Sequence, residues 1–130
     1  MVTMILLDTN VLIWLMTDSE HLGPRARNEI VSASAVFSSP MSIIEVRIKS
    51  MLGKLSVPEP FAELVRDSGV QELPLSHGDA DAISAFPELA RHDPFDRAIA
   101  AQAFQRGLAL MTADRVLLAL SRPFIRDARI

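Results

Sequence analysis

Residues 6–14, LLDTNVLIW, join the end of a predicted strand at 2–7 to a predicted helix at 11–16. The apolar strand stops at Asp8. In an open parallel sheet, ligands bind beyond the carboxyl ends of the strands, which is where Asp8 stands. Thr9 and Asn10 add short polar side chains that can orient a ligand or its waters. Asp8 and Thr9 are also good helix N-caps, so this stretch alone supports a site and a structural cap equally.

Strand-like runs and helical patterns alternate along the chain. Strands are predicted at 2–7, 35–37, 71–74 and 108–111, and helices at 11–16, 24–32, 40–51, 60–67, 78–85, 94–106 and 114–120. Pro24, Pro40, Pro60 and Pro94 fall where a first helical position is expected. This alternation predicts βαβ units, and therefore an α/β fold with a mostly parallel sheet between two layers of helices.

The composition predicts a single domain over residues 1–130, because 49% hydrophobic content is enough for one core. The chain contains no cysteine, which excludes disulfides, thiolate zinc sites and cysteine nucleophiles. Its three histidines, His21, His77 and His92, share no ligand-like spacing. We therefore expect any metal to be held by oxygen, which favours Mg²⁺ or Mn²⁺ over zinc.

The N-terminal residues MVTMILLD carry no basic leader, and no apolar run is long enough to span a membrane, so a cytoplasmic protein is expected. The net charge of −3 argues against binding nucleic acid by bulk attraction. Charge is nevertheless uneven: residues 1–90 carry 6 Lys/Arg and 12 Asp/Glu, whereas residues 91–130 carry 7 Arg and 4 Asp. The arginine-rich end can face phosphates, or its arginines can lie on solvated helix faces.

Four acidic residues are predicted to point to one place: Asp8, Glu45, Asp96 and Asp114. Glu45 lies within an apolar stripe of the helix at 40–51, formed by Met41, Ile44, Ile48, Met51 and Leu52. None of the four has an obvious cationic partner, although Lys49 can reach Glu45. At about 4 Å and an effective dielectric near 20, each carboxylate pair costs about 4 kcal/mol. A divalent cation would compensate this repulsion, so a metal site is predicted.

Two of these acids lie at predicted helix starts, where a structural role is also possible. Asp93, Pro94 and Asp96 form a capping arrangement, in which we assign the cap to Asp93 and the ligand to Asp96. Asp114 follows a late strand, as Asp8 follows the first. Thr112 can hold a metal-bound water or simply cap the helix.

The segments LLDTNVLIW, SIIEVRIKSMLGKL, HDPFDRAIAAQA and MTADRVL resemble those of PIN-domain ribonucleases, specifically the VapC-like toxins of toxin–antitoxin pairs. The likeness extends to about residue 126. It implies a three-layer α/β/α PIN-like fold with a mostly parallel central sheet of four to five strands. It also implies metal-binding or catalytic roles for Asp8, Glu45, Asp96 and Asp114. The aromatic residue usual before the glutamate is Ile44 here.

The implied activity is Mg²⁺- or Mn²⁺-dependent hydrolysis of RNA phosphodiester bonds, by which such toxins inhibit growth. The alternative is a PIN-like module that binds RNA or protein without cutting. A receiver-like signalling domain fits less well, because it needs paired acids after its first strand and a lysine after a late one. A phosphoaspartate phosphatase would need a second aspartate where Asn10 stands.

The resemblance also implies a cognate antitoxin, a homodimer and a toxin–antitoxin hetero-oligomer. Four apolar residues of the first helix, Val11, Leu12, Trp14 and Leu15, are predicted to form part of an antitoxin groove, although Trp14 can equally belong to the core. Arg97 and Arg115 each follow a predicted ligand, and we expect them to contact RNA phosphates unless they face solvent.

Overall fold

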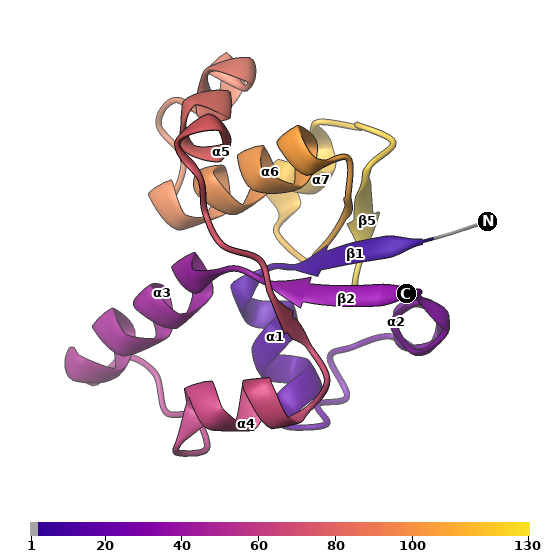
Figure 1. Cartoon of the computed structure of the whole chain (residues 1–130), viewed down its shortest axis with the longest axis vertical. Helices are drawn as coiled ribbons and strands as arrows, with labels where there is room; N and C mark the ends of the chain where they lie inside the picture. The colour runs from indigo at the N-terminus through magenta and orange to yellow at the C-terminus, as the bar shows by residue number, and fades with distance from the viewer. Residues whose placement is uncertain (1–2) are drawn as a thin grey trace.

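The computed structural model describes residues 3–130, and its centre is one five-stranded sheet (Figure 1). The strands are β1 (Met4–Leu7), β2 (Ala35–Ser38), β3 (Gln71–Glu72), β4 (Ala109–Thr112) and β5 (Ile125–Asp127). They lie in the order β3-β2-β1-β4-β5, and each neighbouring pair is parallel. The predicted sheet is therefore confirmed. Val2, which was assigned to the first strand, lies outside the described residues.

The helices between the strands begin and end close to the predicted positions. They are α1 (Thr9–Met16), α2 (Pro24–Ser32), α3 (Pro40–Met51), α4 (Phe61–Asp67), α5 (His77–Asp81), η1 (Ala82–Ala85), η2 (Pro87–Leu89), α6 (Pro94–Arg106) and α7 (Arg115–Ala119). Pro24, Pro40 and Pro94 open their helices as expected, whereas Pro60 is the N-cap of α4. Gly107 ends α6 at φ 66°, a left-handed conformation that favours glycine. Within residues 3–130, no helix has the length and apolar character needed to cross a membrane.

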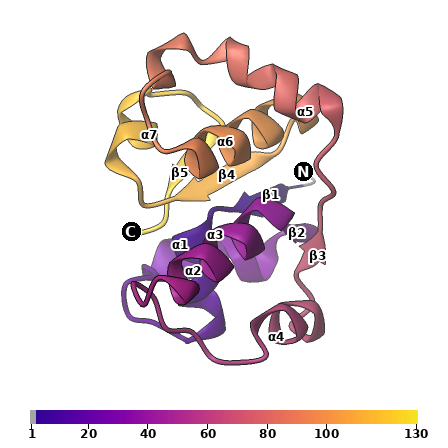
Figure 2. The same ribbon diagram turned by 90° about the vertical axis from the view of Figure 1, so that its left-hand side faces the viewer.

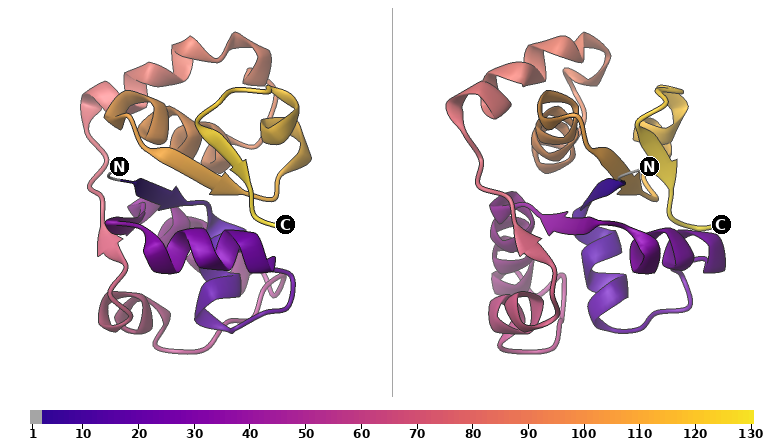
Figure 3. Two further views of the ribbon diagram at one scale, coloured as in Figure 1. Left: turned by 90° about the vertical axis from the view of Figure 1, so that its right-hand side faces the viewer. Right: turned by 45° about the vertical axis from the view of Figure 1, so that its right-hand side comes forward.

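The sheet separates two hydrophobic clusters, which gives the predicted three layers. Ile5 and Leu7 of β1 pack into a cluster with α1, α2, α3 and α4, whereas Leu6 packs into a cluster with α6, α7 and the 3₁₀-helices. This alternation follows from the period of two along a strand. Figures 2 and 3 show α6 and the helices α1 to α4 on opposite sides of the sheet.

The strand order reverses direction beside β1, and this reversal positions the site. The chain passes from β1 outward to β2 and β3, then returns to place β4 on the other side of β1. The carboxyl ends of β1 and β4 are therefore neighbours, and the Asp8 N–H donates to the Met111 carbonyl at 3.1 Å. Ligands bind at such switch points in open α/β sheets.

One predicted helix differs from the structure, and two short elements, η2 and β5, were not predicted. The helix expected at 78–85 is divided into α5 and η1, because it tightens to 3₁₀ hydrogen bonding over its last turn, as helix ends often do. The edge strand β5 was not predicted, since its residues Ile125–Asp127 include a single apolar side chain and show no strand pattern.

The predicted apolar stripe of α3 is not its buried face. Four of its residues are exposed, namely Ile44, Ile48, Met51 and Leu52, whereas Ser42, Glu45 and Val46 are buried. The C-terminal half of α3 extends away from the sheet (Figure 1). Its apolar side chains are therefore left exposed. The expected burial of Glu45 is observed, but spacing among apolar residues is not its cause.

Candidate metal centre

Asp8 both ends β1 and caps α1. Its Oδ1 accepts the Val11 N–H at 2.9 Å, and its Oδ2 accepts the Thr112 hydroxyl at 2.5 Å. Burial raises the pKa of Asp8 to about 6, although these two hydrogen bonds oppose the effect, and the charges of Asp114 and Glu45 raise it further. The carboxylate is thus held rigidly in a place that disfavours its own negative charge.

Asp96, in the first turn of α6, and Asp114, the N-cap of α7, lie on either side of His92. The His92 Nε2 atom is 3.1 Å from Asp96 Oδ2 and 3.2 Å from Asp114 Oδ2. Burial, followed by the hydrogen bond and charge of Asp114, raises the pKa of Asp96 to about 8. For Asp114, burial is outweighed by hydrogen bonds from the Leu117 N–H and Asp96 and by the charge of His92, which keep its pKa below the ordinary value. Without a cation, the two carboxyl groups therefore share a proton.

Glu45 presents a carboxylate oxygen that has no hydrogen-bond partner in the described part of the chain. Its side chain is 6% exposed, and its Oε2 accepts from the Lys49 ammonium at 2.5 Å. Its Oε1 is buried and has no partner among residues 3–130. The expectation that the acids lack cationic partners is therefore wrong for Glu45, because Lys49 one helical turn later reaches it. Lys49 also lies close enough to Asp93 and Asp96 for their charges to raise its pKa, after the larger effect of Glu45.

Short polar side chains tie these acids to the scaffold. The Thr9 hydroxyl donates to Ser42 Oγ at 3.0 Å and so links α1 to α3. The Thr112 hydroxyl donates to Asp8 and accepts the Asp114 N–H at 3.0 Å, so one residue positions two acids. Asp93 caps α6 as predicted, since its Oδ1 accepts the Phe95 N–H at 2.8 Å.

Asn10, the remaining polar residue of the first segment, is exposed on α1. It is therefore less enclosed than its neighbour Thr9, which is buried.

The residues present fit a divalent cation. Buried carboxylates with raised pKa values and an unpartnered carboxylate oxygen both indicate negative charge that the protein leaves uncompensated. His92, Asp96 and Asp114 each offer one ligand atom, and these atoms lie within 4.8 Å of one another. Oxygen-rich sets of this kind suit Mg²⁺ or Mn²⁺.

The two arginines predicted to contact RNA differ in their surroundings. Arg115 is exposed at the start of α7. Arg97 is half-buried, and its Nη1 donates to the Ala90 carbonyl at 3.1 Å. Arg115 is thus free to reach a ligand, whereas Arg97 is engaged with the loop before α6.

The predicted antitoxin groove on α1 needs correction. Val11 and Leu12 are completely buried and pack in the core cluster with α2, α3 and α4, so they cannot line an open groove. They are buried because their face of α1 lies against the sheet. Trp14 and Leu15 pack against the same cluster but keep partial exposure.

Sequence reasoning missed two residues at this centre, His92 and Ser42, whereas the alternative in which Lys49 reaches Glu45 is observed. His92 was set aside because histidine spacing was compared only with other histidines. Its position just before the N-cap Asp93 was the available signal, because the residue before an N-cap can reach the first turn of the helix, where Asp96 lies. Ser42 and Thr9 are 33 residues apart, so no local pattern connects them.

A PIN-domain family model matches residues 5–123. Among solved structures, the DNA-bound VapBC complex of Salmonella typhimurium contains a chain 26% identical to this one, with 98% of each chain covered and a TM-score of 0.67. VapBC-1 of nontypeable Haemophilus influenzae is 19% identical, with 96% and 98% covered and a TM-score of 0.65, and shows likeness of fold. No curated protein gives a sequence match.

The family match covers both strands that carry the acidic cluster and nearly the whole sheet. The resemblance seen in the sequence motifs is therefore confirmed. Together, the motifs, the parallel sheet and the family match show that the chain belongs to the PIN-domain family.

Proposed function

We propose that this chain is a divalent-metal-dependent endoribonuclease and the toxin component of a toxin–antitoxin pair. The observation that carries the nuclease proposal is the Oε1 of Glu45, which has no partner among residues 3–130. It belongs to a cluster with Asp8 after β1, Asp114 after β4 and Asp96 in the first turn of α6. Support for the toxin proposal comes from similarity to the Salmonella VapBC complex, and a structure of like fold is described as a VapBC toxin–antitoxin system from Mycobacterium tuberculosis.

Each side chain has a distinct part in the proposed reaction. A bound divalent ion would activate water and neutralise charge on the phosphate and the leaving oxygen. Asp8, Asp96 and Asp114 would hold it, and Thr112 fixes the orientation of Asp8. The free Oε1 of Glu45 can accept a hydrogen bond from the attacking water and orient it. Lys49 would offset the charge of Glu45 as the anionic phosphate approaches.

The nuclease proposal is tested with purified protein and a panel of RNAs. We expect cleavage with Mg²⁺ or Mn²⁺, loss of cleavage in excess EDTA, and loss in Asp8→Asn. Asp67→Asn is a matched control, because Asp67 is an exposed acid at the end of α4. Equal cleavage in EDTA would overturn the metal mechanism. RNA binding without turnover would instead favour the alternative, a PIN-like module that binds without cutting.

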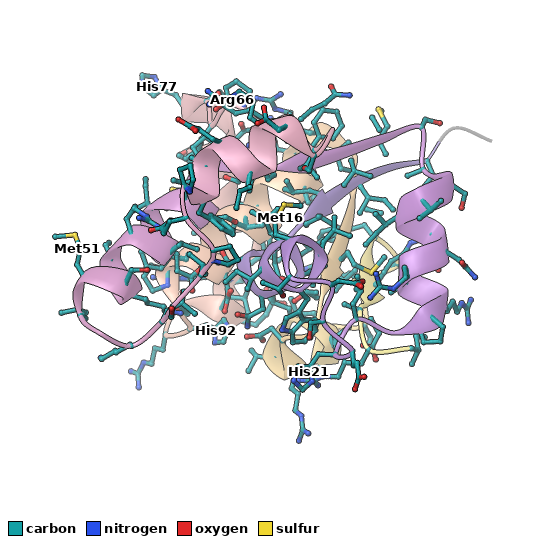
Figure 4. The ribbon with its side chains drawn as sticks, turned by 90° about the horizontal axis from the view of Figure 1, so that it is seen from below. Met16, His21, Met51, Arg66, His77 and His92 are labelled. Atoms are coloured by element: carbon teal, nitrogen blue, oxygen red, sulfur yellow. The ribbon has the colours of Figure 1, made fainter. Side chains whose placement is uncertain are left out.

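We further propose a cognate antitoxin and a homodimer. The exposed apolar residues of α3 offer area that a protein partner can cover: Ile44, Ile48, Met51 and Leu52. Met51 extends away from the body of the molecule at the tip of α3 (Figure 4). Co-expression with the protein encoded beside this chain should yield a complex in which RNA cleavage is suppressed.

A further inference from the structure

Among residues 3–130, His92 is the one nitrogen in this cluster of carboxylates that can bind a metal, because the Lys49 ammonium has no lone pair to offer. It comes from the loop between η2 and α6, and its backbone N–H donates to the Leu89 carbonyl at 2.9 Å, which fixes the loop. Its side chain is 20% exposed. The ring is thus held between Asp96 and Asp114 by the fold and is not a freely rotating surface group.

The spacing of the three donor atoms suits an octahedral ion. Two neighbouring ligands at about 2.1 Å from such an ion lie about 3 Å apart. The His92 Nε2 atom is 3.1 Å and 3.2 Å from the nearest oxygens of Asp96 and Asp114. An independent sign that the cluster takes a cation is the buried Oε1 of Glu45, which has no hydrogen-bond partner in the described chain.

We propose that His92 is a metal ligand through Nε2 and that it shifts the selectivity of this centre from Mg²⁺ towards Mn²⁺. The inference rests on the proposed function and names the cation class of the same site. Imidazole nitrogen suits first-row transition ions, whereas Mg²⁺ prefers oxygen ligands alone. A centre of one nitrogen and several carboxylate oxygens therefore discriminates against Mg²⁺, contrary to the all-oxygen site expected from the sequence.

A different role for His92 explains the same distances. A protonated imidazole can donate hydrogen bonds to both carboxylates and act as a cation in place of a metal. In that case a bound ion would displace the ring, and His92 would have no direct bond to it. The two roles predict different surroundings for a bound Mn²⁺ ion, so spectroscopy separates them.

The experiment uses the full chain with Mn²⁺ alone, in the absence of RNA. Pulsed electron paramagnetic resonance is expected to detect one directly bound ¹⁴N nucleus in the wild-type protein. The signal should vanish in His92→Gln and persist in His77→Gln. His77 is a suitable control because it is exposed at the start of α5, well away from His92 (Figure 4). An absence of ¹⁴N coupling in the wild type overturns the proposal, whether or not a variant folds.

Calorimetric titration supplies the second readout. The ratio of Mn²⁺ to Mg²⁺ affinity should fall on the order of tenfold in His92→Gln, because the amide replaces nitrogen with a weaker oxygen ligand. An unchanged ratio in a folded variant contradicts the role of His92. Both readouts are made without RNA, so they test the His92 proposal independently of RNA cleavage. If the chain binds Mn²⁺ through His92 but does not cut RNA, only the nuclease proposal is overturned. A chain that cuts RNA but shows no ¹⁴N coupling overturns the His92 proposal alone.

Discussion

Replacing Asp8 with asparagine should make the metal-free protein more stable at pH 8. The pKa of Asp8 is raised from 3.8 to about 6, so the folded protein binds this proton more tightly than the unfolded chain does. At pH values above both, holding the ionised side chain in the fold costs about 3 kcal/mol. Asparagine removes that cost and keeps the Oδ1 acceptor for the Val11 N–H.

The substitution also removes an acceptor. The Thr112 hydroxyl loses its carboxylate partner, which costs about 1 kcal/mol. The net gain is about 2 kcal/mol, or a rise in Tm of about 5 °C or more for a domain of this size. Since the raised pKa destabilises the fold as pH rises from about 4 to about 6, the advantage of Asp8→Asn should shrink on acidification and disappear near pH 4.

Thermal melts at several pH values in EDTA measure the effect, and Asp79→Asn is the control of opposite sign. Burial alone would raise the pKa of Asp79, but hydrogen bonds from Arg106 and Ser76 lower it, so ionised Asp79 stabilises the fold. Asp79→Asn should lower Tm at neutral pH, and the difference in Tm from the wild type should become smaller as pH falls. A lower Tm for Asp8→Asn at pH 8, or a difference that does not vary with pH, would refute the reasoning.

Three further predictions concern neighbouring residues. Lys49→Met should lower the Tm of the metal-free protein, because it leaves the buried Glu45 carboxylate without its cationic partner. Added Mn²⁺ should raise the Tm of this variant more than that of the wild type. An equal rise in Tm for both proteins would contradict the idea that Lys49 and the metal ion neutralise the same carboxylates. Arg115→Ala should weaken RNA binding and make it less dependent on salt concentration. Arg97→Ala should mainly lower Tm, because the Arg97 side chain donates a hydrogen bond to the Ala90 carbonyl. If Arg115→Ala and the wild type bind RNA identically across salt concentrations, Arg115 is excluded from the RNA interface. Trp14→Ala should weaken co-purification of the antitoxin, and circular dichroism should show an intact fold; a collapse of the fold would assign Trp14 to the core, against which it packs.

The sequence predicted the sheet and most helix boundaries, because these depend on local pattern. That the four acids act together as metal ligands stays a prediction. An acid directly after an apolar strand, as Asp8 is, has its place set by the strand itself. The apolar stripe of α3 was wrongly predicted to be buried. The same spacing of apolar residues arises whether a helix face packs against its own chain or is left open to a partner. The roles of His92 and Ser42 depend on loops and helix packing that bring distant residues together, which periodicity does not encode.

The hydrogen bond between Asp8 and Thr112 joins residues 104 positions apart. Because translation runs from the N-terminus to the C-terminus, Asp8 is synthesised well before Thr112 and Asp114. A nascent chain therefore carries the first acid long before it can form β4 and complete the cluster. Contacts of such long range also form late in folding, because the loop they close is costly in entropy. The proposed activity would therefore arise only after β4 and Asp114 have joined the first strand.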